Sequence, residues 1–161
     1  MLNVSSKEII NKIATIQQCW ADNVINIGKA YLEKKDYVTI TKTFIDELYF
    51  FKKGKILFKP TKASHKQFRK TKDEFISYFI GYNKVSLEDK GFALEPWKNI
   101  EYNNFDFAKF ENVLISMGNY IFTDYKENKT KVEYSFGYML DQDENKLKII
   151  FHHSSLPFNN N

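Results

Sequence analysis

The segment KVEYSFGYML, residues 131–140, decides the fold of this chain. Successive side chains of a β-strand point to opposite faces of the sheet. Val132, Tyr134 and Phe136 therefore share one face, while Glu133 and Ser135 lie on the other. One face is apolar and the other is polar, which is typical of an antiparallel sheet with one side in water.

The neighbouring segments extend this pattern. The polar run 141–145 is a plausible hairpin turn, and it leads into a terminal strand over 146–155. Strands are also predicted at about 97–102 and 113–123, and a short one at 55–58 that Pro60 stops. Four of these five strands follow one another along the C-terminal half of the chain.

The terminal strand ends on two histidines and two serines. Leu147, Ile149 and Phe151 are apolar and alternate in the strand, so we expect them to form its buried face. Strict alternation continues this face to His153 and Ser155, where the core ends and a cavity can begin. It places His152 and Ser154 on the opposite side.

Helices precede the strands. Ser5 and Glu8 have the spacing of a capping box, and an apolar stripe with steps of three and four residues continues to about residue 33. A second helix is predicted over 36–50, with Phe44, Ile45 and Leu48 facing inward.

A third, short helix begins after the capping-box pair Thr71 and Glu74 and ends at Gly81. Helices followed by consecutive antiparallel strands predict an α+β fold. We expect a single domain over 1–161 in which the long N-terminal helix packs across the concave side of a curved antiparallel sheet. Such a cone leaves a pocket between helix and sheet.

Composition excludes several classes of protein. No apolar run approaches the length of about 20 residues that crosses a bilayer, and the N-terminus lacks the blocks of a signal peptide. Cys19 is the single cysteine, so no intrachain disulfide can form. We therefore expect a cytoplasmic protein that does not bind a membrane.

The net charge of +4 is unevenly distributed. Residues 48–72 hold nine Lys and Arg and no Asp or Glu. Such a segment either attracts anions or forms a solvated face. The phenylalanines Phe50, Phe51, Phe58 and Phe68 are interleaved with these charges, as in some nucleic-acid-binding segments, but core packing explains them better. No nucleic-acid partner is expected.

A zinc site at the histidine pair is disfavoured. Neighbours on a strand point to opposite faces, so His152 and His153 do not readily bind one ion, although a β-bulge would break this alternation. A catalytic zinc also needs about three protein ligands, and the other candidates, His65 and Cys19, lie in unrelated contexts. We expect no metal and no other cofactor.

A histidine and a hydroxyl on one cavity face suit acid–base chemistry on a small substrate, because imidazole exchanges protons near neutral pH. The same residues can instead satisfy backbone groups at a strand end. A serine hydrolase is not indicated, since the chain has no Gly-x-Ser-x-Gly nucleophile elbow.

Eight blocks spread in order along the chain carry a family resemblance. They are IQQ with Trp20 and INIG (16–28), LFKPT (57–61), SYFIG (77–81), EDKGFAL (88–94), MGNY (117–120), VEYSFGY (132–138) and HHSSLP (152–157). Together they resemble the iota-class carbonic anhydrases. These belong to the cystatin-like, nuclear-transport-factor-2-like (NTF2-like) superfamily and are akin to the association domain of calcium/calmodulin-dependent kinase II.

The resemblance implies a dimeric α+β cone that interconverts carbon dioxide and bicarbonate, in some members without a metal. The family pocket uses a Thr, a Tyr and a Ser near the histidine pair, which correspond here to Thr61, Tyr78 and Ser155. Alternation along the strand adds His153. His152 and Ser154 replace His153 and Ser155 if the register of the strand shifts.

The expected mechanism follows from this set. Thr61, Tyr78 and Ser155 bind the substrate oxygens and stabilise the developing negative charge, while His153 orients or deprotonates the attacking water. Two alternatives remain: an association module that binds only a regulatory ligand, or another lyase or isomerase of the superfamily. In each case we expect a homodimer or a higher homo-oligomer.

Overall fold

The computed structural model describes residues 5–159, and a long helix opens it. Helix α1 (Ser6–Leu32) begins where Ser5 Oγ accepts a hydrogen bond of 3.3 Å from the backbone N–H of Glu8. Its apolar stripe is buried as predicted up to Ile27, whereas Tyr31, the last expected member, is exposed. The buried members are Ile9, Ile13, Ile16, Trp20, Val24 and Ile27. The stripe gives α1 one face that must pack against a sheet.

Shorter elements follow between residues 37 and 94. They are α2 (Tyr37–Leu48), β1 (Leu57–Lys59), α3 (Lys72–Ile80) and the 3₁₀ helix η1 (Phe92–Leu94). The predicted capping box of α3 forms between Thr71 and Glu74. Gly81 ends α3 with φ +62°, a left-handed conformation that favours glycine.

The C-terminal half forms the sheet. Its strands are β2 (Trp97–Phe110), β3 (Val113–Asp124), β4 (Lys129–Asp141) and β5 (Lys146–Ser155). The order is β1-β5-β4-β3-β2, antiparallel throughout except that β1 runs parallel to β5. This parallel pair brings the segment after β1 to the end of β5.

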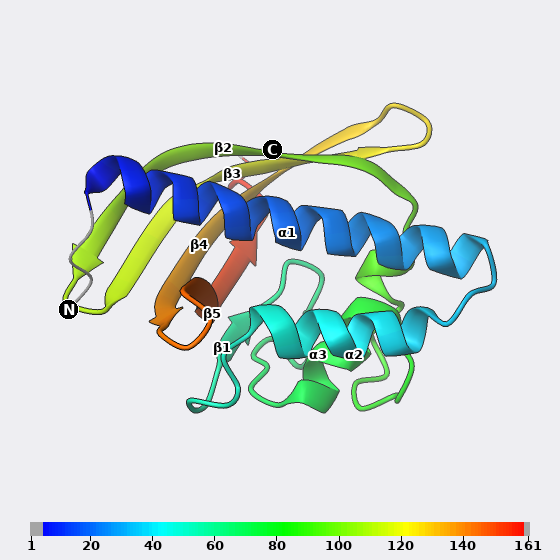
Figure 1. Cartoon of the computed structure of the whole chain (residues 1–161). Coiled ribbons are helices and arrows are strands. Elements are labelled where there is room, and N and C mark those ends of the chain that lie inside the picture. The colour runs from blue at the N-terminus through cyan, green and yellow to red at the C-terminus, as the bar shows by residue number, and fades with distance from the viewer. Residues whose placement is uncertain (1–4, 160–161) are drawn as a thin grey trace.

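The helices cover one face of the sheet. Figure 1 shows α1 lying across the sheet, with α2 and α3 beside it near β1. An aromatic core fills the space between the layers, and Trp20 is among its largest members. The predicted α+β cone is therefore confirmed. No helix among residues 5–159 is both long enough and apolar enough to cross a membrane.

Strand β2 is longer than its sequence predicts, because it continues past residue 102 to Phe110. The polar residues in its second half lie on an exposed surface, and a register shift between Asn104 and Asp106 accommodates them. Gly118 on β3 allows this irregular strand to approach: a Cβ at position 118 would lie 2.4 Å from the carbonyl oxygen of Asn103.

Candidate active site

The end of β5 presents the face opposite to the one predicted. His152 and Ser154 are buried, with 1 % and 3 % of their surfaces exposed, whereas His153 is exposed and Ser155 is half-buried. The expectation that Phe151, His153 and Ser155 continue the buried face is therefore wrong, and Phe151 is exposed as well. The same expectation placed His152 and Ser154 outside, and they lie inside.

A β-bulge at Ile150 is the cause. Tyr138 on β4 pairs with Ile149, but the next residue, Gly137, pairs with Phe151, so Ile150 has no partner in the register. One extra residue reverses the alternation of every later side chain. Gly137 fits at this point because a Cβ there would come within 3.1 Å of the Phe151 Cβ.

Four side chains form what we call the inner hydroxyl cluster: Tyr49, Tyr120, His152 and Ser154. His152 Nδ1 lies 3.0 Å from the Tyr49 hydroxyl, and Nε2 lies 3.0 Å from Ser154 Oγ and 3.3 Å from the Tyr120 hydroxyl. Tyr120 and Ser154 are also hydrogen-bonded to each other. The cluster joins three separate elements of the chain around one imidazole.

The direction of these hydrogen bonds follows from Trp20. Its indole N–H can only donate, and it donates to the Tyr49 hydroxyl at 3.0 Å. The Tyr49 proton is then available to His152 Nδ1, which leaves the imidazole proton on Nε2. Nε2 donates to Ser154 or Tyr120, and the bond between those two uses only one of their hydroxyl protons. One hydroxyl proton in the cluster remains for an additional acceptor.

Aromatic rings enclose the imidazole. Phe136 and Phe58 stack on it with centroid distances of 4.2 and 4.7 Å, and Trp20 meets it edge-on at 5.7 Å. This burial, together with the nearby His153, holds the pKa of His152 well below its usual 6.5. His152 is consequently neutral at pH 7 and has one nitrogen able to accept a proton.

The hydroxyls keep their protons. Burial raises the pKa of Tyr49 and Tyr120 above the usual value of 10. Both are therefore neutral donors or acceptors over the physiological pH range. A neutral imidazole among neutral hydroxyls leaves one hydroxyl proton for an acceptor oxygen that these four residues do not supply.

Thr61 and Tyr78 both line a pocket of about 710 Å³ between α1, α3 and η1. Thr61 follows β1 by two residues, and the Tyr78 hydroxyl accepts a hydrogen bond of 3.5 Å from the Lys62 N–H. Neither His153 nor Ser155 lines this pocket. Phe58 separates it from the inner hydroxyl cluster, since its ring contacts both Tyr78 (5.4 Å) and His152 (4.7 Å).

A carboxylate fixes the loop that carries Thr61. Glu88 accepts hydrogen bonds from the backbone N–H groups of Ser64, His65 and Lys66 at 2.8–3.0 Å. These bonds, that of His65 first, lower the pKa of Glu88 to about 2. The loop is therefore tied to the segment that forms the opposite wall of the pocket.

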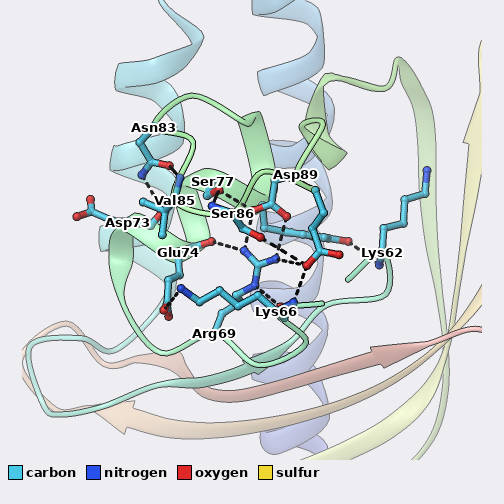
Figure 2. Close-up of polar contacts among 12 residues, drawn as sticks. Lys62, Lys66, Arg69, Asp73, Glu74, Ser77, Asn83, Val85, Ser86 and Asp89 are labelled. Carbon is cyan, nitrogen blue, oxygen red and sulfur yellow. Dashed lines mark hydrogen bonds and ion pairs between the residues drawn. The ribbon is translucent and has the colours of Figure 1, made fainter. Parts of the chain in front are cut away.

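A buried ion pair supports the same loop from behind (Figure 2). Arg69 is fully buried and donates to both carboxylate oxygens of Asp89 at 2.7 and 2.8 Å. Ser77 on α3 donates to Asp89 at 2.5 Å, and Arg69 also donates to the carbonyl oxygens of Lys66 and Glu74. With so many partners, this pair fixes β1, α3 and the loop relative to each other.

His153 and Ser155 lie on the outer face of the sheet. They line a shallow groove of about 570 Å³ with Phe105, Met117 and Glu133. Ser155 Oγ donates to a Glu133 carboxylate oxygen at 3.3 Å. Partial burial and the nearby Lys59 lower the pKa of His153. This groove is separated from the inner hydroxyl cluster by the sheet itself.

The basic segment 48–72 is largely neutralised in space. Five of its nine cations form ion pairs with acids from other segments: Lys52–Asp141, Lys62–Glu95, Lys66–Glu74, Arg69–Asp89 and Lys72–Asp46. Phe50 and Phe58 are buried in the core as expected, whereas Phe68 is exposed. Within the described range, no three His, Cys, Asp or Glu side chains gather in a way that could hold a metal ion.

Sequence reasoning missed Tyr49 and Tyr120. Tyr49 ends α2 and forms an isolated bridge with Ile149, which gives the sequence no motif. Tyr120 does have a signal, because it lies on the apolar face of β3 with Phe122, but that pattern also fits an ordinary core residue. The hydroxyls matter only because β5 brings His152 between them.

The fold and the site define a class: an α+β cone with a buried imidazole and hydroxyls, suited to a small oxygen-bearing molecule. The sequence profile described as metal-independent carbonic anhydrase matches residues 11–156. The chain belongs to the metal-independent carbonic anhydrase family. A protein of that name from Nostoc sp. is 36% identical over 151 residues, which are 92% of this chain and 73% of the relative.

Solved structures agree. The crystal structure of an iota-carbonic anhydrase from a cyanobacterium, complexed with bicarbonate, is similar with a TM-score of 0.87 and 34% identity, covering 97% of this chain and 94% of that one. A calcium/calmodulin-dependent protein kinase II association domain from Xanthomonas campestris shares the fold alone, with a TM-score of 0.52 and 17% identity over 96% and 89% of the two chains. The predicted family resemblance is confirmed.

Proposed function

We propose that this protein catalyses the reversible hydration of carbon dioxide to bicarbonate without a metal cofactor. Membership of the metal-independent carbonic anhydrase family and the likeness to a bicarbonate-bound relative support this function. The observation that carries it here is the neutral, buried His152 with Ser154 and Tyr120 on one ring nitrogen.

The reaction forms one C–O bond between water and carbon dioxide and releases one proton. In the proposed mechanism, whichever of Ser154 and Tyr120 keeps its hydroxyl proton free donates a hydrogen bond to the oxygen on which negative charge develops. The water proton passes to His152 Nε2, directly or through a hydroxyl, when the imidazole is in the other tautomer, whose Nδ1–H donates to the Tyr49 hydroxyl oxygen. The low pKa of His152 then favours rapid loss of that proton.

Thr61 and Tyr78 belong to the proposal as residues of the adjoining pocket. The pocket is open to solvent and is lined by both polar and apolar groups, so it can admit carbon dioxide and release bicarbonate. Phe58 forms the wall between this pocket and His152. We place Thr61 and Tyr78 on the substrate path, with His152 and Ser154 at the reacting atoms.

A second copy of the chain is the proposed partner. The outer face of the sheet exposes several apolar side chains, and such a surface is typical of a site that a partner covers. These side chains are Phe105, Phe110, Ile115, Met117 and Phe151. The likeness to an association domain supports self-association, and these exposed apolar residues are the surface that we propose for it. A cytoplasmic location is also proposed, and the single Cys19 agrees with a protein that needs no disulfide.

Stopped-flow measurement of carbon dioxide hydration tests the function directly. Purified protein is stripped of metals with a chelator, and the chelator is removed before the assay. We expect hydration above the uncatalysed rate that survives this treatment, and Ser154→Ala is the control with strongly reduced activity. Loss of activity that zinc restores would contradict the metal-free mechanism, and absence of activity in all samples would favour an association module.

A further inference from the structure

Two buried side-chain oxygens among the described residues lack a hydrogen bond, the Tyr102 hydroxyl and Asp141 Oδ2, but Asp141 Oδ2 forms an ion pair with Lys52. Tyr102 lies on β2, and its hydroxyl oxygen is buried with no hydrogen-bond partner among the described residues. The hydroxyls of the buried tyrosines Tyr49, Tyr78, Tyr120, Tyr134 and Tyr138 each have at least one partner. A buried hydroxyl without a partner is unfavourable, so it points to a partner that the chain itself does not supply.

The position of Tyr102 connects two polar groups of the cone. Its ring contacts Tyr120 of the inner hydroxyl cluster at a centroid distance of 5.4 Å. On another side it contacts Tyr134 at 5.5 Å, whose hydroxyl bonds to Gln17 and donates to Asn104. Tyr102 therefore borders the cluster on the side away from Phe58 and the Thr61 pocket.

One small ligand could accept hydrogen bonds from both the inner hydroxyl cluster and the Tyr102 hydroxyl. The inner hydroxyl cluster retains one hydroxyl proton without an acceptor, and Tyr102 adds a second buried donor beside it. Burial also raises the pKa of Tyr102, so its hydroxyl stays protonated. An oxygen-bearing ligand with several acceptor sites, such as bicarbonate, can accept from both donors at once.

We propose that Tyr102 is a further catalytic residue, whose hydroxyl donates to an oxygen of the substrate held at the inner hydroxyl cluster. This inference rests on the proposed function and adds a donor from β2, on the opposite side from Thr61 and Tyr78. In the hydration direction it stabilises the oxygen that becomes negative as water attacks. In the reverse direction it orients bicarbonate against Ser154 and His152.

The variant Tyr102→Phe tests the proposal because it removes only the hydroxyl. If nothing in the chain bonds to that oxygen, the variant keeps or gains thermal stability, since a buried unsatisfied group is lost. If the oxygen contacts substrate, kcat/KM for hydration falls by about 10- to 1,000-fold. The matched control is Tyr138→Phe, whose hydroxyl bonds to Ser116 and Gln17, and which should lose stability.

Protection by bicarbonate supplies a readout that does not depend on turnover. We expect sodium bicarbonate, against sodium chloride at equal ionic strength, to raise the Tm of the wild type more than that of Tyr102→Phe. If the wild type is active and Tyr102→Phe has the same kinetics and the same protection by bicarbonate, the inference about Tyr102 is overturned while the proposed function stands. That result would indicate a structural water at the Tyr102 hydroxyl. A large loss of Tm in Tyr102→Phe would also overturn the inference. A wild type with neither activity nor protection would overturn the proposed function as well.

Discussion

His152 and Ser154 lie two residues apart on β5, and the imidazole Nε2 approaches Ser154 Oγ at 3.0 Å. Residues i and i+2 of a strand share a face, so the backbone alone holds this pair in register. Their neighbours His153 and Ser155 have the same chemistry but lie on the outer face of the sheet. The chain thus contains an inner pair and its own matched control.

Replacing Ser154 and Ser155 one at a time by alanine tests whether the inner or the outer His–Ser pair takes part in the reaction. We expect Ser154→Ala to lower kcat/KM for carbon dioxide hydration by about 100-fold, because it removes a buried donor beside the reacting oxygen. Ser155→Ala removes only a contact to Glu133 on the outer face and should stay within a few fold of wild type. Stopped-flow assays of both variants measure this. Equal losses, or a larger loss in Ser155→Ala, would contradict the assignment.

Sequence alone predicted the layers of this fold well, because long apolar stripes and capping boxes are local signals. The buried stripe of α1 and the Thr71–Glu74 cap both formed as expected. The orientation of the histidine pair failed for a non-local reason. The bulge at Ile150 depends on pairing with β4, which no pattern within β5 reveals.

The candidate site was predictable only in part, because some of its residues come together through tertiary packing alone. Thr61 and Tyr78 were placed together by family resemblance, and the structure brings both to one pocket. Tyr49 and Tyr120 join His152 only through tertiary packing, so each appears in the sequence as an ordinary core aromatic. A buried polar cluster whose residues come from three separate elements has no regular spacing in the sequence by which it could be recognised.

The low pKa of His152 predicts how stability depends on pH. The folded state holds His152 neutral, while the unfolded chain protonates a histidine near pH 6.5. Below that pH the unfolded state binds more protons, so stability falls as pH decreases, by up to about 1.4 kcal/mol per pH unit. This pH dependence of the unfolding free energy disappears about one pH unit above the unfolded pKa and continues downward toward the pKa of His152 in the folded state.

Urea unfolding between pH 5 and 8 measures this dependence. Carboxylates with lowered pKa values, such as Glu74 and Glu88 at about 2, change the stability mainly below about pH 4.5. They therefore add little to the pH dependence between pH 5 and 8. We expect His152→Gln to flatten the dependence more than His153→Gln, whose imidazole is exposed on the outer face. A stability profile that His152→Gln leaves unchanged would show that His152 is protonated equally in both states.

Glu88 should affect catalysis through the loop that carries Thr61. Glu88→Ala removes the acceptor for three backbone N–H groups, so we expect a loss of about 1–2 kcal/mol in unfolding free energy and a raised KM. Glu33→Ala is the control, because Glu33 forms an exposed ion pair with Lys35 outside the pocket and such pairs contribute about 0–1 kcal/mol. Comparable effects in both variants would mean that Glu88 has no special role in the loop.

The self-association that we propose for the outer face of the sheet predicts that assembly can be separated from catalysis. Met117 is exposed beside Phe105 and His153, and a charge there would be desolvated in any interface formed by this face. We expect Met117→Glu to shift the protein toward monomer in light scattering after size exclusion, while Leu87→Glu, at an exposed position away from the sheet, leaves the assembly unchanged. Because the inner hydroxyl cluster comes from one chain, monomeric Met117→Glu should keep its hydration activity. Loss of activity with assembly would mean instead that the site needs the second copy.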